Sequence, residues 1–116
     1  MVDDVNVSVA FYEKYLGFTV LTNYAPAFAD VIRGNLRLLL SGQTSSAGRA
    51  MPDGTIPVPG GWNRFQIVVS DLSAEVAKLK AQGLHFRNEI IKGPGGSQIL
   101  LPDPSGNFIE LFEPAH

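Results

Sequence analysis

The chain has 116 residues, of which 45% are hydrophobic and 17% charged, a composition typical of one globular domain with a single core. Its formal net charge of -2 offers no broad positive field, so we expect no nucleic-acid partner. Cysteine is absent, which excludes disulfides, thiolate nucleophiles and cysteine-ligated zinc. No apolar run approaches the ~20 residues of a membrane-spanning helix, and no leader pattern opens the chain. The sequence therefore predicts a cytoplasmic protein without a membrane partner.

The first third of the chain has the pattern of one helix followed by three strands. Apolar residues recur at helical spacing over residues 5–16, Asp4 or Asn6 can cap the start, and Gly17 can end the helix. Runs rich in β-branched, aromatic and leucine residues follow, separated by turn residues, and they predict an antiparallel meander. The three strands are predicted at residues 18–24, 27–32 and 36–40.

The rest of the chain begins with a segment of different composition. Residues 42–61 are rich in Gly, Pro, Ser and Thr, and we interpret them as a linker loop. A strand over 62–69 then leads through Asp71, a helix cap, into a helix over 73–82. Three further strands are predicted at residues 84–91, 97–101 and 107–112.

The two halves form an internal repeat. Residues 34–40 (GNLRLLL) match residues 106–112 (GNFIELF), and each half contains a helix followed by three strands. In the second half a further strand precedes the helix, whereas in the first half the matching strand would begin before residue 1. The sequence thus predicts one α+β domain, with a first module in residues 1–41 and a second module in residues 62–116.

Four segments, in this order, carry a family pattern: residues 11–18 (FYEKYLGF), 60–66 (GGWNRFQ), 71–72 (DL) and 103–112 (DPSGNFIELF). Together they resemble the vicinal oxygen chelate superfamily, which includes glyoxalase I, bleomycin resistance proteins and extradiol dioxygenases. The resemblance implies paired βαβββ modules whose sheets curl into a shared cup, here with a first module that lacks most of its opening strand. It also implies a homodimer, because a partner subunit would cover the sheet edge left by that strand.

The resemblance further implies where a metal would lie. Enzymes of the superfamily hold a divalent metal in the cup with His, Glu or Gln ligands. Glu110 matches one ligand position, the repeat makes Leu38 its counterpart, and Arg64 stands where a His ligand is expected. Leucine has no lone pair to donate and a charged arginine repels a cation. We therefore expect no metal cofactor, and a divalent metal held at Glu110 is the alternative.

The family geometry makes strands 62–69 and 107–112 neighbours, so that Arg64 faces Glu110. We hypothesise that this pair, our candidate catalytic residues, supplies the charge balance that a metal would provide. The opposing interpretation is an exposed cross-strand pair that contributes little to stability. Side-chain alternation adds further residues to the same surface. The predicted ligand-binding set is Trp62, Arg64, Gln66, Leu38, Phe108, Glu110 and Phe112.

The sequence thus predicts a glyoxalase/bleomycin resistance protein/dioxygenase-like protein that binds a small apolar or carbonyl-containing molecule in the cup. The alternatives are a metal-dependent lyase or dioxygenase of the same superfamily, and a structural or regulatory dimer without a ligand. Trp62 is equally consistent with an anchor at a dimer interface or in a loop. His85 and His116 are typical of surface residues rather than of a catalytic base.

Overall fold

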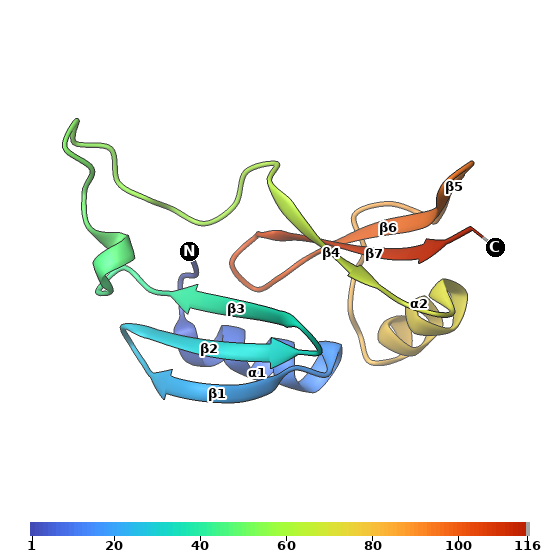
Figure 1. Cartoon of the computed structure of the whole chain (residues 1–116), viewed down its shortest axis with the longest axis horizontal. Helices are drawn as coiled ribbons and strands as arrows, with labels where there is room; N and C mark the ends of the chain where they lie inside the picture. The colour runs from blue at the N-terminus through green and yellow to red at the C-terminus, as the bar shows by residue number, and fades with distance from the viewer. Residues whose placement is uncertain (116) are drawn as a thin grey trace. The chain divides into compact units, whose positions relative to one another are not determined.

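The computed structural model describes residues 1–115, so that the predicted surface residue His116 lies outside the described residues. The elements, shown in Figure 1, are α1 (Val5–Leu16), β1 (Thr19–Tyr24), β2 (Phe28–Arg33), β3 (Leu36–Ser41), the short 3-10 helix η1 (Ser46–Gly48), β4 (Arg64–Val68), α2 (Leu72–Ala81), β5 (Ile91–Gly93), β6 (Gly96–Pro102) and β7 (Phe108–Pro114). The chain divides into two compact units. Unit 1 contains Met1–Gly60 and Pro104–Gly106, and unit 2 contains Gly61–Asp103 and the chain from Asn107 onward.

Helix α1 has the boundaries that the sequence predicts. The side chain of Asp4 accepts a hydrogen bond from the backbone nitrogen of Val7 (3.1 Å), which satisfies a donor that the first turn of a helix leaves free. The helix ends at Gly17, whose φ of 69° is the left-handed conformation that glycine adopts without strain. The predicted cap and the predicted stop are therefore both confirmed.

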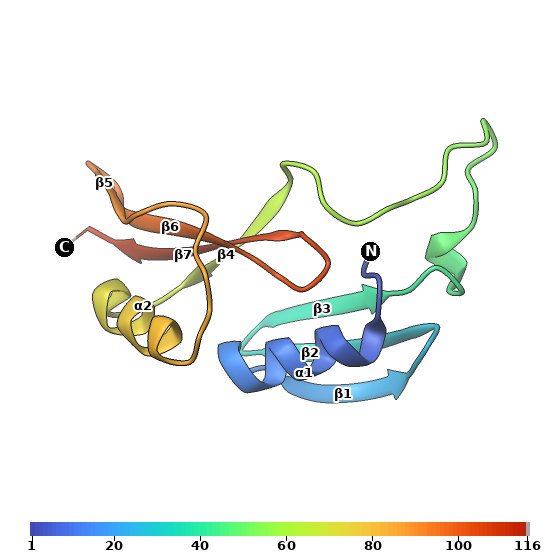
Figure 2. The ribbon, with the colours of Figure 1, turned by 180° about the vertical axis from the view of Figure 1, so that it is seen from behind.

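Unit 1 contains α1 and a three-stranded antiparallel meander in the order β1-β2-β3, as the sequence predicts. Helix α1 packs against this sheet, as the view in Figure 2 shows. The backbone nitrogen of Val2 donates to the carbonyl of Ser41 (2.9 Å) at the outer edge of β3. The buried apolar side chains of the helix and the sheet include Val5, Val9, Tyr12, Leu16, Ala29, Val31 and Leu40.

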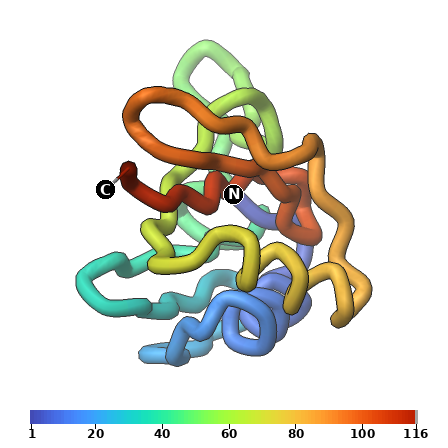
Figure 3. Tube along the Cα trace, turned by 90° about the vertical axis from the view of Figure 1, so that its right-hand side faces the viewer, coloured from blue at the N-terminus to red at the C-terminus, as the bar shows by residue number. Residues whose placement is uncertain are grey.

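Unit 2 contains α2 and a four-stranded sheet in the order β4-β7-β6-β5, in which β4 runs parallel to β7 and the other pairs are antiparallel. Helix α2 is capped by Asp71, which accepts from the backbone nitrogen of Ala74 (3.0 Å). The carboxylate of Glu113 on β7 accepts from the backbone nitrogen of Leu72 (2.7 Å). Each unit therefore combines one α-helix with one sheet. Figure 3 shows the course of the chain through these elements from the side. No helix in residues 1–115 is long and apolar enough to cross a membrane.

The structure corrects two predicted strands. The strand predicted over 62–69 begins only at Arg64, so Trp62 precedes it. Most of the strand predicted over 84–91 is irregular, and only Ile91–Gly93 pairs with β6. The Oδ1 of Asn88 accepts a hydrogen bond from the backbone nitrogen of Leu100 (3.2 Å). A side chain therefore takes the place of the backbone carbonyl that a paired strand would offer to β6.

The turn between β6 and β7 fixes where β7 begins. Asp103 is buried and closes the turn, because its Oδ1 accepts from the backbone nitrogen of Asn107 (2.9 Å) and its Oδ2 from the Asn107 side chain (3.1 Å). Gly106 supplies the positive φ of 82° within the turn. The turn thereby sets the β6–β7 register, in which Leu100 pairs with Glu110. In the parallel β4–β7 pair, Arg64 lies beside Phe108 and Gln66 beside Glu110.

Candidate functional site

The two faces of the unit 2 sheet differ in character. One face carries fully buried apolar side chains, and neighbouring residues on each strand project to the opposite face because side chains alternate. We call this opposite surface the site face. Its residues on β4 and β7 are Arg64, Gln66, Phe108, Glu110 and Phe112.

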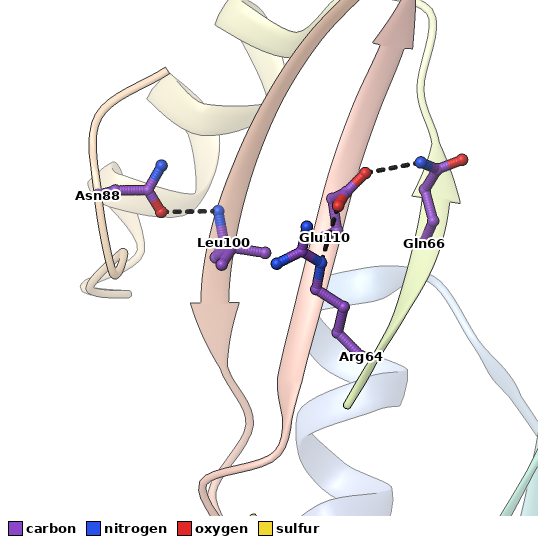
Figure 4. A network of polar contacts seen from close by, with 5 residues as sticks. All are labelled: Arg64, Gln66, Asn88, Leu100 and Glu110. Carbon is purple, nitrogen blue, oxygen red and sulfur yellow. Dashed lines mark hydrogen bonds and ion pairs between the residues drawn. The ribbon is translucent and has the colours of Figure 1, made fainter. Parts of the chain in front are cut away.

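Both oxygens of the Glu110 carboxylate have protein partners. The Nε of Arg64 lies 2.9 Å from Oε1, and the Nε2 of Gln66 donates to Oε2 at 2.6 Å. Figure 4 shows both side chains reaching Glu110 from β4, with the Arg64 guanidinium extending across Glu110 toward Leu100 on β6. The predicted approach of Arg64 to Glu110 is therefore present, and Gln66 of the predicted set joins it.

The Arg64–Glu110 pair combines a buried carboxylate with an accessible guanidinium. The Glu110 side chain is 9% exposed and the Arg64 side chain is 40% exposed. The prediction of an exposed pair therefore does not describe Glu110. The Nε of Arg64 binds Glu110, while in Figure 4 its terminal nitrogens lie beyond the carboxylate. These terminal N–H groups are donors that a ligand oxygen can accept from.

An aromatic stack adjoins this cluster. The rings of Trp62 and Phe108 are stacked, with centroids 5.4 Å apart and planes inclined by 26°. The guanidinium carbon of Arg87 lies 5.8 Å from the centre of the Trp62 ring, within the range of a cation–π contact. Sequence reasoning missed Arg87, because its segment has the composition of a strand and its contact with Trp62 depends on the tertiary fold.

Leu38 does not occupy the position predicted for it as the counterpart of Glu110. Leu38 pairs across from Val31, which is fully buried, so it lies on the core face of its sheet, whereas Glu110 projects away from the core of unit 2. The opposite face of β2 and β3 carries Asp30, Arg37 and Leu39. A shift of one residue along a strand moves a side chain to the other face of the sheet. When the two sheets are compared face by face, Leu39 rather than Leu38 is therefore the counterpart of Glu110.

The residues present do not fit the divalent metal that the resemblance implies. Among residues 1–115, no three His, Cys, Asp or Glu side chains lie together in an arrangement that could hold a metal ion. Both oxygens of Glu110 accept from protein donors, and the donor to Oε1 is the positively charged Arg64. Divalent metals in proteins are usually held by three or more protein ligands, which this cluster does not provide.

A separate hollow of about 490 Å³ lies where α2 ends. It contains the predicted surface residue His85, together with charged groups of both signs, and neither Arg64 nor Glu110 lines it. The lining residues are Lys80, Gly83, Leu84, His85, Phe86, Arg87, Asn88 and Glu89. Arg87 therefore belongs to the rim of this hollow and also contacts Trp62.

Comparison with known proteins identifies relatives along almost the whole chain. The model of the glyoxalase/bleomycin resistance protein/dioxygenase superfamily matches residues 1–111. Lactoylglutathione lyase of Schizosaccharomyces pombe is 29% identical to this chain, and the match covers 97% of this chain and 42% of that protein. The chain therefore spans less than half the length of that relative.

Two solved structures share the fold at low sequence identity. A lactoylglutathione lyase from Agrobacterium tumefaciens superposes with a TM-score of 0.77 at 23% identity, covering 97% of this chain and 87% of that chain. An antibiotic binding protein from a Streptomyces species superposes with a TM-score of 0.72 at 22% identity, covering 99% and 93% of the two chains. The same fold thus occurs in a protein named as a lyase and in a protein named as an antibiotic binding protein.

Proposed function

Because this chain belongs to the glyoxalase/bleomycin resistance protein/dioxygenase superfamily, we propose that it binds a small, largely apolar molecule through a carbonyl or carboxylate oxygen, without a divalent metal. The binding surface is the site face of unit 2. The observation that carries the proposal is the engagement of both Glu110 oxygens by Arg64 and Gln66. A carboxylate held in this way is a partner for a guanidinium rather than a ligand for a metal ion.

The chemistry of the cluster favours an oxygen-bearing ligand. Glu110 holds the Arg64 guanidinium through Nε, which orients the terminal N–H groups in the fixed fork that recognises carbonyl and carboxylate oxygens. Trp62, Phe108 and Phe112 surround this polar point with apolar area. Small-molecule sites typically combine such apolar walls with a few placed polar groups.

The second candidate function is that of a metal-dependent lyase or dioxygenase of the same superfamily. It is favoured by the similarity to the Schizosaccharomyces pombe protein, whose name is lactoylglutathione lyase. It requires a metal at Glu110, so the metal content of the purified protein separates the two candidates.

The metal experiment compares the wild-type chain with Glu110→Ala and Arg64→His. After dialysis against zinc, nickel or manganese, elemental analysis is expected to find no stoichiometric metal in the wild-type chain. Arg64→His removes the positive charge and adds an imidazole beside Glu110, and we expect it to bind zinc or nickel more tightly than the wild type. Stoichiometric metal in the wild type that disappears in Glu110→Ala would establish the second candidate instead.

The ligand experiment uses cyclohexanecarboxylate and cyclohexyl methyl ketone, which combine an apolar body with one acceptor group. Trp62 is the one tryptophan of the chain, so its fluorescence reports binding at the site face. We expect both probes to bind in the presence of a chelator, and Arg64→Met to weaken carboxylate binding about tenfold. Arg49→Met, in the exposed loop of unit 1, is the matched control. Equal affinities for the wild type and Arg64→Met would contradict the proposal.

We further propose that the chain forms a homodimer. The outer edge of β3 bonds to Val2 through Ser41, and in the described residues no strand pairs with the rest of this edge. Proteins normally cover such an edge, and a second copy of the chain supplies a cover. Light scattering during size-exclusion chromatography tests this, because elution at the mass of one 12.5 kDa chain at micromolar concentration would disprove it.

A further inference from the structure

Trp62 is unusually accessible for a large aromatic side chain that has two protein partners. It is 70% exposed, although it stacks on Phe108 and contacts the Arg87 guanidinium. An exposed indole leaves apolar area in water, which is unfavourable unless something else covers it. The contacts therefore hold the ring in place without burying it.

The Trp62–Arg87 contact reaches over the sheet of unit 2. Arg87 lies at the outer edge of β6, where its backbone nitrogen donates to the carbonyl of Leu100 (2.8 Å), whereas Trp62 precedes β4 at the other side of β7. Their side chains meet above the strands between them. We call the exposed indole of Trp62, which rests on the Phe108 ring beside the positive charge of Arg87, the aromatic platform.

The platform adjoins the Arg64–Glu110 pair. Phe108 is the neighbour of Arg64 in the β4–β7 ladder, and adjacent strands lie ~4.8 Å apart. Glu110 balances the charge of Arg64, and Arg87 brings a second guanidinium to the Trp62 ring. This surface combines a flat ring with two guanidinium groups and one carboxylate.

We propose that the ligand of the site face is a planar aromatic carboxylate. Its ring packs against Trp62, and its carboxylate accepts hydrogen bonds from the terminal nitrogens of Arg64. This inference rests on the proposed function and adds two requirements to it, a flat ring and a negative charge. Arg87 is a positioning residue that holds the indole in place.

The experiment compares three probes of similar size by calorimetry and by NMR. 2-Naphthoate has the flat ring and the charge, decahydro-2-naphthoate has the charge without the flat ring, and 2-naphthylmethanol has the ring without the charge. We expect 2-naphthoate to bind about tenfold more tightly than either of the others, because a stacked ring and a charge-assisted pair each contribute about this factor.

The variants assign each requirement to a residue. Trp62→Leu is expected to bring 2-naphthoate and its saturated analogue to similar affinity, whereas Trp62→Phe, which keeps a ring, should retain the preference. Arg64→Met should bring 2-naphthoate and 2-naphthylmethanol together. Tyr24→Leu is the matched control, because Tyr24 is an exposed aromatic residue whose ring contacts the tilted ring of Phe28 in unit 1.

The role of Arg87 has its own readout. Arg87→Gln is expected to weaken 2-naphthoate binding about threefold and to make Trp62 fluorescence more easily quenched by acrylamide, because the indole loses a contact. Arg87→Lys should keep most of the wild-type affinity for 2-naphthoate and most of the wild-type protection from acrylamide. Unchanged quenching in Arg87→Gln would remove the positioning role.

The outcomes distinguish this inference from the proposed function. If 2-naphthoate and its saturated analogue bind equally and both depend on Arg64, the aromatic requirement is wrong and the proposed function stands. If the charged probes bind without dependence on Arg64, or no probe binds the wild-type chain, both are wrong. Amide NMR spectra of each variant establish that it is folded before its affinity is interpreted.

Discussion

Each unit of the molecule contains a buried acid bound by the Nε of an arginine. In unit 1 the Nε of Arg37 lies 2.8 Å from Asp30, and in unit 2 the Nε of Arg64 lies 2.9 Å from Glu110. Both acid side chains are 9% exposed, and both arginines are about half exposed. Each pair lies on the sheet face opposite the buried apolar residues.

The surroundings of the two pairs differ. Asp30 lies across from Thr22, whose hydroxyl also lowers the pKa of this acid by hydrogen bonding, and across from Leu39 on the other side, whereas Glu110 has the amide of Gln66 as its second donor. The Trp62–Phe108 stack also adjoins the pair of unit 2. An arginine–carboxylate pair is therefore common to both units, and what distinguishes the candidate site is the Gln66 amide as second donor and the aromatic platform beside the pair.

The largest effect on this comparison is expected from Glu110→Ala. It removes the acceptor of two side chains and leaves a partly buried guanidinium without its partner, so we expect a loss of about 2 kcal/mol in the free energy of unfolding, reduced from the value for a fully buried pair because Arg64 is accessible. Urea denaturation measures this. Glu89→Ala, whose side chain is 94% exposed, is the control and should change little. A loss as small as that of the control would show that the Arg64–Glu110 pair does not contribute to stability.

Gln66→Leu should have a smaller effect, because it removes one hydrogen bond and leaves the Arg64–Glu110 contact in place. We expect a loss of about 1 kcal/mol in the free energy of unfolding. The same variant should weaken binding of 2-naphthoate, because Glu110 and with it Arg64 become less fixed. Unchanged stability together with unchanged binding would make the second donor irrelevant to the comparison.

Arg37→Met should separate the two pairs by function. We expect it to leave the affinity for 2-naphthoate unchanged, whereas Arg64→Met lowers it about tenfold. Calorimetric titrations of both variants under identical conditions measure this difference. Equal losses in the two variants would indicate that both pairs serve the ligand.

The smallest effect is expected from pH. The hydrogen bond from Arg37 holds the pKa of Asp30 below the ordinary value of an aspartate, against the opposing effect of burial. A lowered folded-state pKa contributes stability that is present above the unfolded-state pKa and is lost as pH falls through the folded-state value. The stability difference between the wild type and Asp30→Asn should therefore be larger at pH 6 than at pH 3. Denaturation at both values measures it, and a difference that grows on acidification would contradict the assignment.

Local chemistry and the repeat predicted much of the molecule. Asp4 and Gly17 define a helix through contacts within one or two turns. The family resemblance implied that the strands of Arg64 and Glu110 are neighbours, and the period-2 pattern then placed both residues on one face. The run of leucines at 38–40 offers no such alternation, so the sequence did not reveal which of them faces the core. The irregular path of 84–90 depends on the distant contact between Asn88 and Leu100, which no local pattern encodes.

Strand β7 carries two acids whose tasks lie on opposite faces of the sheet. Glu110 binds Arg64 on the site face, and Glu113, three residues later, accepts the first N–H of α2. Because three is an odd number of steps along a strand, one inserted residue in the turn that Asp103 closes would exchange the faces of both acids at once. The length of this turn is therefore fixed by two requirements, the Glu110–Arg64 contact and the Glu113–Leu72 contact. Protein engineering that varies loop length should use the long loop 42–61 instead.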